Sequence, residues 1–181
     1  MTGAESMRSV AAAGFTLEPQ CAIHADEMYE LLSDRAIYRY ENEPPSSPDW
    51  LRARFSRLES RRSPDGREQW LNWVIRLPNS ELAGYLQASV QPTGRAAIAY
   101  VLASRHWGRG LGTQAVASMI EELGANHGVT DLSAVLKRSN VESLRLLERL
   151  RFSHADATTL EAIGADPDEW LMVRPLRMPS P

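Results

Sequence analysis

The sequence predicts a single α+β (mixed α/β) domain in which helices flank a central mixed, mostly antiparallel sheet. The chain has 181 residues, and compact domains usually contain about 100–200. Three strand patterns separated by short turns lie between residues 70 and 102 and predict an antiparallel meander. A strand–helix–strand–helix alternation follows, so the sheet is expected to be mixed.

The first quarter of the chain predicts one strand and two helices. Residues 15–19 alternate as a first strand does, and apolar residues at near-helical spacing in 22–33 predict a helix. The proline-rich stretch 44–48 breaks regular structure. Asp49 is then expected to cap a second helix, which ends near the turn signal at 63–66.

The middle of the chain predicts the meander and a longer helix. Strands are expected at 70–77, 82–90 and 96–102, because apolar and β-branched runs alternate there with Pro- or Gly-containing turns. Residues 108–124 carry apolar side chains on one helical face. Those residues are Leu111, Ala115, Met119, Ile120 and Leu123.

The last part of the chain predicts the second half of the sheet. A buried strand is expected at 132–136 and an amphipathic helix at 139–149. Ser139 and Glu142 have capping-box spacing, which sets the start of that helix. Short strands are expected near Phe152, at 158–160 and at 170–173.

The composition excludes several classes of protein. Hydrophobic residues make up 43% and charged residues 24% of the chain, as in globular rather than disordered or fibrous proteins. No run approaches the roughly 18 apolar residues of a membrane span. The net charge of −3 argues against nucleic-acid binding through a basic surface. A single cysteine, Cys21, excludes an intrachain disulfide and a multi-cysteine metal site. From these three observations together we expect no metal, no membrane and no nucleic acid as partner.

The two ends of the chain are expected to lie outside the domain. The longest apolar run in residues 1–14 is too short for a secretory signal. We therefore predict a flexible N-terminal leader at 1–14, a domain at 15–176 and a tail at 177–181, in a cytoplasmic protein.

Three alternating glycines, Gly108, Gly110 and Gly112, lie where a strand ends and a helix begins. Glycine permits positive φ and close approach of backbone to a ligand. The start of a helix offers unpaired N–H groups and a partial positive charge. The segment therefore predicts a cradle for a phosphate or pyrophosphate, with a tight turn that binds no ligand as the alternative.

Two phosphate-binding motifs fit this turn poorly. A P-loop is excluded because no lysine follows any of the glycines. A dinucleotide fingerprint is met at Gly108 and Gly110, but its third glycine is replaced by Thr113. Asp131 lies about twenty residues on, where a ribose-binding acid is expected. The antiparallel strands before the turn argue against this second reading, which leaves a nicotinamide oxidoreductase as a minor alternative.

Residues 107–112, Trp-Gly-Arg-Gly-Leu-Gly, resemble the Q/R-x-x-G-x-G/A acetyl-coenzyme A signature of the GNAT acetyltransferase family, with Trp in the first place. The Trp-Gly-x-Gly run is similar to that of the family's ribosomal-protein N-terminal acetyltransferase branch. Asn140, Ser143 and residues 146–152 resemble a second pattern of that branch, N-x-x-S with a leucine-rich helix and Gly-Phe. The last pair here is Arg-Phe, so the glycine is lost.

The resemblance covers about residues 15–176 and implies a GNAT-like domain that uses acetyl-coenzyme A (acetyl-CoA). In this family an amine attacks the acetyl thioester directly within a ternary complex. The acceptor implied is a primary amine, either a protein N-terminus or a small molecule such as an aminoglycoside-like amine or an amino acid. An exposed edge strand is compatible with a homodimer.

The resemblance also implies a set of cofactor-binding residues. Backbone N–H groups of 108–113 hold the pyrophosphate, and Arg109 adds charge-assisted bonds. The backbone at Leu102 and Ala103 pairs with the pantetheine like an added strand, and an N–H near Leu102 polarises the thioester carbonyl. Asn140 bonds the pantetheine arm and Ser143 lies near the thiol, although helix capping alone also explains these two. The whole set is Leu102, Ala103, Gly108, Arg109, Gly110, Leu111, Gly112, Thr113, Asn140 and Ser143.

The usual proton-transfer residues of the branch are missing. The position of the usual glutamate is Ala97, and that of the usual tyrosine, seven residues after the asparagine, is Leu147. Replacement candidates are Ser143 as donor to the thiolate, His106 because it titrates in the useful range, and Glu43 with its neighbour Glu41. Positioning alone can supply about 7–11 kcal/mol, whereas a general base adds roughly 10²–10⁴-fold.

Other functions remain open from the sequence. Because the usual proton carriers are missing, a rival class remains. It is a non-catalytic acyl-CoA-binding sensor or interaction module with the same fold. Transfer of a different acyl group, or transfer to a hydroxyl acceptor, is the alternative among enzymes.

Overall fold

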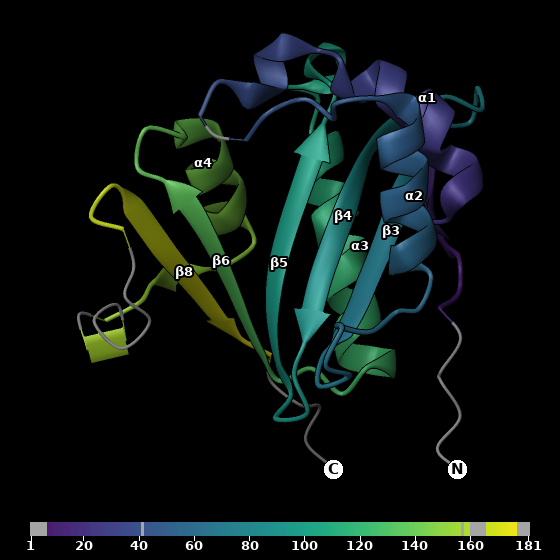
Figure 1. Ribbon diagram of the computed structural model, residues 1–181. Coiled ribbons are helices and arrows are strands. Elements are labelled where there is room, and N and C mark those ends of the chain that lie inside the picture. The colour runs from purple at the N-terminus through teal and green to yellow at the C-terminus, as the bar shows by residue number, and fades with distance from the viewer. Residues whose placement is uncertain (1–6, 41, 157, 160–165, 177–181) are drawn as a thin grey trace.

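The computed structural model describes residues 7–40, 42–156, 158–159 and 166–176, which form an eight-stranded sheet with helices on both faces (Figure 1). The strands are β1 (Val10–Ala12), β2 (Phe15–Pro19), β3 (Gln69–Arg76), β4 (Leu82–Val90), β5 (Arg95–Leu102), β6 (Asp131–Lys137), β7 (Ser153–His154) and β8 (Glu169–Pro175). The α-helices are α1 (Ala25–Leu32), α2 (Pro48–Leu58), α3 (Leu111–Asn126) and α4 (Val141–Arg149), with 3-10 helices η1 (Ala22–His24), η2 (Arg35–Tyr38) and η3 (Ser104–His106). The predicted mixed α/β class is confirmed.

The sheet has the strand order β1-β2-β3-β4-β5-β6-β8-β7, and all neighbours are antiparallel except β5 and β6. That parallel pair is in register at only three positions, Arg95 with Asp131, Ala96 with Leu132 and Ala97 with Ser133. Beyond them the two strands separate toward their C-terminal ends, as Figure 1 shows. The separation opens a gap within the sheet.

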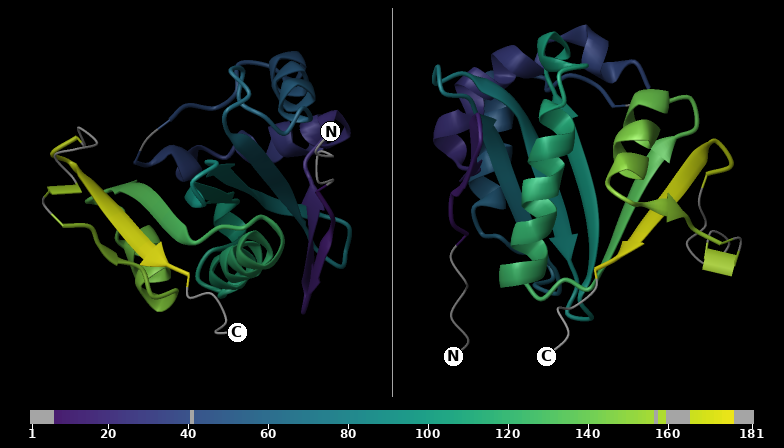
Figure 2. Two further views of the ribbon diagram at one scale, coloured as in Figure 1. Left: turned by 90° about the horizontal axis from the view of Figure 1, so that it is seen from below. Right: turned by 180° about the vertical axis from the view of Figure 1, so that it is seen from behind.

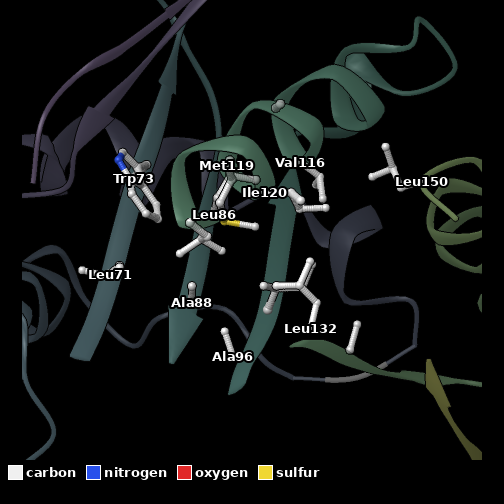
Figure 3. Close-up of a cluster of buried hydrophobic side chains, with 14 of the residues drawn as sticks. Leu71, Trp73, Leu86, Ala88, Ala96, Val116, Met119, Ile120, Leu132 and Leu150 are labelled. Atoms are coloured by element: carbon white, nitrogen blue, oxygen red, sulfur yellow. The ribbon is translucent and has the colours of Figure 1, made fainter. Parts of the chain in front are cut away.

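Two apolar cores hold the helices on the sheet. On one face α3 packs Val116, Met119 and Ile120 toward Trp73 and Leu86 of the strands (Figure 3). On the other face α1 and α2 cover β3 and β4 through a smaller cluster that includes Met28, Leu51, Phe55 and Val74. Figure 2 shows α3 and α4 together on the face opposite α1 and α2. Burial of these side chains contributes about 25 cal/mol per Å² of apolar area to the free energy of folding, and it is the main interaction that holds the helices against the sheet.

The long periodic elements agree with the sequence prediction. β2 and β4 have the predicted bounds, and β3, β5 and β6 begin one residue earlier than expected. The second helix ends at Leu58, which is before the predicted turn at 63–66. β8 contains the strand expected at 170–173.

The expectation of a leader over residues 1–14 is wrong for its last part. Residues 10–12 form β1, which pairs with β2 in a hairpin, Val10 with Leu17 and Ala12 with Phe15. The strand has three small residues, too few to show a period, so the alternation signal was missing. Residues 1–6 and 177–181 lie outside the described part of the chain.

Two predicted helix caps and one strand are corrected. Ser47 caps α2, since its hydroxyl accepts a hydrogen bond from Trp50 N–H, and Pro48 rather than Asp49 begins the helix. Asn140 caps α4 in place of the predicted Ser139 capping box, because its Oδ1 accepts from Ser143 N–H at 3.1 Å. Thr158 and Thr159 are helical rather than extended; Leu160, the last residue of that predicted strand, is outside the described residues.

Candidate active site

A cavity of about 760 Å³ occupies the gap where β5 and β6 separate. Its walls include Ala99 and Tyr100 of β5, Val135 and Leu136 of β6, and Ser143 of α4. Successive strand residues point to opposite faces of a sheet, so these neighbours show that the cavity passes through the sheet. A ligand in it would reach both the α1–α2 face and the α3–α4 face.

The segment that follows α1 covers one side of the cavity. Tyr38 and Tyr40 line it, as does Glu43. The Tyr40 hydroxyl donates to Glu142 Oε2 at 2.8 Å, which ties this segment to the first turn of α4. Asp34, just before η2, accepts a 3.1 Å hydrogen bond from Ser104 N–H. Hydrogen bonding by the Ser104 side chain is the largest cause that lowers the pKa of Asp34, and this backbone bond adds to it.

The glycine-rich turn has the conformation that the sequence predicted. Gly108 and Gly110 have φ of +71° and +79°, in the left-handed region that favours glycine. A Cβ at Gly108 would meet nothing within 4 Å, and one at Gly110 only Gln114 Nε2 at 3.8 Å. Gly112 serves packing instead, because a Cβ there would lie 3.1 Å from Leu146 of α4. The space in front of the first two glycines is therefore open to a ligand.

The first turn of α3 offers main-chain donors at this open space. Gly110 is the N-cap residue and no side chain caps the helix. The first intrahelical bond from this turn runs from Gln114 N–H to Gly110 O, so the amides of residues 111–113 lack acceptors within the helix. Arg109 is exposed beside them. Amides and a helix dipole in this arrangement attract an anion.

Leu102 and Ala103 end β5 at the edge of the gap. Ala103 N–H donates to Ala83 O at 2.9 Å, so this amide is used within the sheet. Successive residues of a strand direct their N–H groups to opposite neighbours, and Leu102 N–H therefore faces the gap. The Leu102 carbonyl, on the same side, accepts a 3.0 Å hydrogen bond from Trp107 Nε1.

Ser143 lies at the α4 wall of the cavity beside an unexpected partner. Its Oγ is 2.6 Å from the hydroxyl of Tyr100, which also lies 3.5 Å from the Ser143 carbonyl oxygen. Burial raises the pKa of Tyr100 to about 12, against a smaller lowering by the Ser143 hydrogen bond. Asn140 contributes Oδ1 to the cap, which leaves its Nδ2 for other partners.

The structure does not bring all proposed proton carriers together. Glu43 lines the cavity, as does Ser143. His106 is not among the lining residues, and its Nε2 lies 3.4 Å from Glu81 Oε1. Glu41 is outside the described residues.

Sequence reasoning did not place Tyr85 or Tyr100 in the cavity wall. Tyr85 and Trp50 line the cavity together with the tyrosines already named, and Arg54 lies over the Trp50 ring at 5.7 Å. Burial raises the pKa of Tyr85 and raises that of Tyr38 to about 12. Trp73 does not line the cavity and is fully buried under α3. Strand alternation within 95–102 could have placed Tyr100 on the α4 face, but not its distance from Ser143.

Within the described ranges, no three His, Cys, Asp or Glu side chains are grouped so as to hold a metal ion. No helix in the same part of the chain is both long and apolar enough to cross a membrane.

A known protein family has this architecture. Residues 15–153 match the acetyltransferase (GNAT) domain. A search of curated proteins finds no match.

Several solved structures share the fold at low sequence identity. RimL, described as a ribosomal L7/L12 alpha-N-protein acetyltransferase in complex with coenzyme A, is 15% identical with a TM-score of 0.77, over 93% of this chain and 98% of that one. The ribosomal-protein-S5-alanine acetyltransferase from Vibrio fischeri is 17% identical with a TM-score of 0.77, over 93% and 97%. The aminoglycoside acetyltransferase AAC(6')-Ib in complex with coenzyme A is 22% identical with a TM-score of 0.71, over 89% and 94%.

Proposed function

We propose that this chain, which belongs to the GNAT acetyltransferase family, transfers acetyl from acetyl-CoA to a primary amine in a ternary complex. One observation carries the proposal: a helix start with open glycines follows β5, and Ala99 and Tyr100 of this strand line a cavity that also has Ser143 in its wall. The coenzyme A bound in RimL and in AAC(6')-Ib, which share the fold, agrees with it.

The residues present fit the parts of acetyl-CoA. The amides of residues 111–113 and the Arg109 guanidinium would hold the pyrophosphate, since a helix start favours negative charge. Leu102 N–H would bond the arm of the cofactor in the gap, as an added strand does. Asn140 Nδ2 would bond the same arm.

Acetyl-CoA supplies an activated acyl carbon, and the chain must orient the amine, leave water a path to take its proton and protonate the leaving sulfur. The aromatic walls around Trp50 and Tyr85 would pack against the acceptor. Among the described residues, Glu43 is the carboxylate that lines the cavity, and in this proposal it would hold a cationic amine before attack. Ser143 would donate to the thiolate. The acceptor is a protein N-terminus or a small-molecule amine, and RimL and AAC(6')-Ib are named for one of each.

The cradle is tested by Gly110→Trp against Gly66→Trp. Both glycines have positive φ, +79° and +71°, so both substitutions cost about 1–2 kcal/mol of folding free energy. Gly66 also has open space around it, but it lies in the turn before β3. We expect calorimetry to find coenzyme A binding abolished in Gly110→Trp and unchanged in Gly66→Trp. Unaltered affinity in Gly110→Trp would place the pyrophosphate elsewhere.

A thiol-release assay with peptides, aminoglycosides and amino acids then tests the transfer itself. Ala97 and Leu147, in place of the branch's glutamate and tyrosine, favour a second candidate, a non-catalytic acyl-CoA sensor. Binding of acetyl-CoA with no turnover on any amine would support the sensor. Turnover with one acceptor class would establish the enzyme.

A further inference from the structure

Tyr100 and Ser143 form a hydrogen-bonded pair across the gap, and among the described residues no other side chain hydrogen-bonds to either hydroxyl. Tyr100 extends from β5 on the face of Ile98 and Leu102, and Ser143 lies in the first turn of α4. Their oxygens are 2.6 Å apart and both residues line the cavity. Leu147, one turn further along α4, is 1% exposed and occupies the position at which the sequence comparison expects a phenol.

Either hydroxyl of the pair can be the donor in the 2.6 Å contact, and the surroundings at residue 143 favour donation by the phenol. The phenol lies near two oxygens of residue 143, Oγ at 2.6 Å and the carbonyl at 3.5 Å, and a carbonyl oxygen only accepts. Tyr100 therefore has acceptors for its single proton at residue 143. If the phenol donates to Oγ, the proton of Ser143 is left to point into the cavity. Without that donor, a serine in a helix commonly turns its proton to a carbonyl of the preceding turn.

We propose that Tyr100 is a positioning residue for Ser143, which it holds so that the serine proton faces the sulfur of the cofactor. This rests on the proposed function for the presence of the thioester. As the C–N bond forms and the C–S bond breaks, Ser143 gives its proton to sulfur and regains one from water, while the amine nitrogen releases one to water. Tyr100 stays protonated throughout, in keeping with the burial of its ring.

The first test measures binding rather than turnover. Coenzyme A is compared with its analogue that lacks the sulfur atom, by calorimetry from about pH 7 to about pH 10, across the range in which thiols ionise. If Ser143 donates to sulfur, the thiolate form of coenzyme A binds better than the thiol form. The affinity of coenzyme A relative to the sulfur-free analogue should then grow with pH, by roughly tenfold for a charge-assisted bond. Tyr100→Phe, which keeps the ring volume, is expected to remove most of that growth. A pH-dependent preference that is the same in both proteins would overturn the proposal.

The second test uses a double-mutant cycle on turnover. Tyr100→Phe and Ser143→Ala are each expected to lower kcat by roughly tenfold, with KM for acetyl-CoA within about twofold, and the double variant should lose no more than Ser143→Ala alone. Tyr29→Phe, on α1 and outside the cavity lining, serves as the matched control. Additive losses would show that Tyr100 acts independently of Ser143 and would refute the proposal. An inactive wild-type protein that still shows the pH-dependent preference would instead refute only the proposed transfer.

Discussion

The hydroxyl of Tyr40 donates a 2.8 Å hydrogen bond to Glu142, 102 residues later in the chain, and so connects the segment above the cavity to α4. This bond lowers the pKa of the Glu142 carboxyl, because the ionised form is the better acceptor. The connection lies on the side of the cavity that we propose for the acceptor, and it is not part of the glycine turn.

Loss of this connection is expected to affect the acceptor more than the cofactor. In Tyr40→Phe the covering segment is held less firmly, so KM for the acceptor should rise, by less than about tenfold because an exposed bond is weak. Steady-state kinetics with a saturating concentration of acetyl-CoA measure this change. Glu142→Gln retains an acceptor oxygen and should show a smaller rise. A larger effect on coenzyme A affinity than on acceptor KM would contradict the assignment.

Trp107 is expected to preorganise the cradle. Its Nε1 donates to Leu102 O at 3.0 Å although the residue is 45% exposed, so the bond fixes the turn between β5 and α3. Trp107→Phe removes one hydrogen bond worth about 1 kcal/mol, which corresponds to roughly fivefold weaker coenzyme A binding. Isothermal titration calorimetry measures the difference. Equal affinity in the two proteins would mean that the turn holds its shape without the indole.

Gly84 should tolerate no side chain. A Cβ at this position would lie 2.0 Å from Val101 O on the neighbouring strand, so β4 and β5 would have to separate. We expect Gly84→Ala to lower the free energy of unfolding by about 3 kcal/mol, as severe overpacking does. Urea denaturation measures the loss. Gly14→Ala, which has positive φ and open space, is the comparison, and its loss should be nearer the strain of about 1–2 kcal/mol.

The ion pair between Arg8 and Glu122 predicts a pH-dependent stability. Arg8 Nη2 lies 2.7 Å from Glu122 Oε2, and the carboxylate is 3% exposed. The Arg8 hydrogen bond is the largest cause that holds the Glu122 pKa below its ordinary 4.5. A depressed carboxyl pKa adds stability above the unfolded value, and that stability is lost as the pH falls through the folded value.

Arg8→Gln is therefore expected to be less stable than wild type at neutral pH. The difference in stability between the two proteins should shrink as the pH drops below the ordinary carboxyl value of 4.5. Glu122 is protonated in the variant first, and once it is protonated in both proteins the ion pair no longer stabilises the wild type. Denaturation midpoints between neutral and acidic pH measure it. A difference that stays constant over this range would show that Arg8 stabilises the N-terminal segment by packing and not by charge.

The sequence could predict those features whose causes are local. The period of two in β4, the turn signals around it and the glycines at 108 and 110 all depend on a few neighbouring residues, and the structure has each of them. β1 was missed because three small residues carry no period. Ser139 and Asn140 are both good caps, and which of them begins α4 depends on where the chain leaves β6.

The chemistry of the site depended on distances that no local pattern contains. Tyr100 and Ser143 are 43 residues apart in sequence, and they meet because β6 returns beside β5 before α4 begins. His106 follows the same strand as Tyr100, yet it lies beside Glu81 instead of in the cavity. The conformation of the glycine turn was therefore predictable from neighbouring residues, whereas the set of ionisable side chains that line the cavity was not.

Only three residue pairs join β5 to β6, so the backbone ladder between the N-terminal five strands and the C-terminal three is short. A ligand inserted in the gap would supply hydrogen bonds that neither strand finds in its neighbour. We expect amide exchange in β6, β8 and α4 to slow markedly when coenzyme A is added, and the amides of β3 and β4 to change little. In that sense the cosubstrate would act as a missing strand, and loading would couple two parts of the protein that this short ladder joins without it.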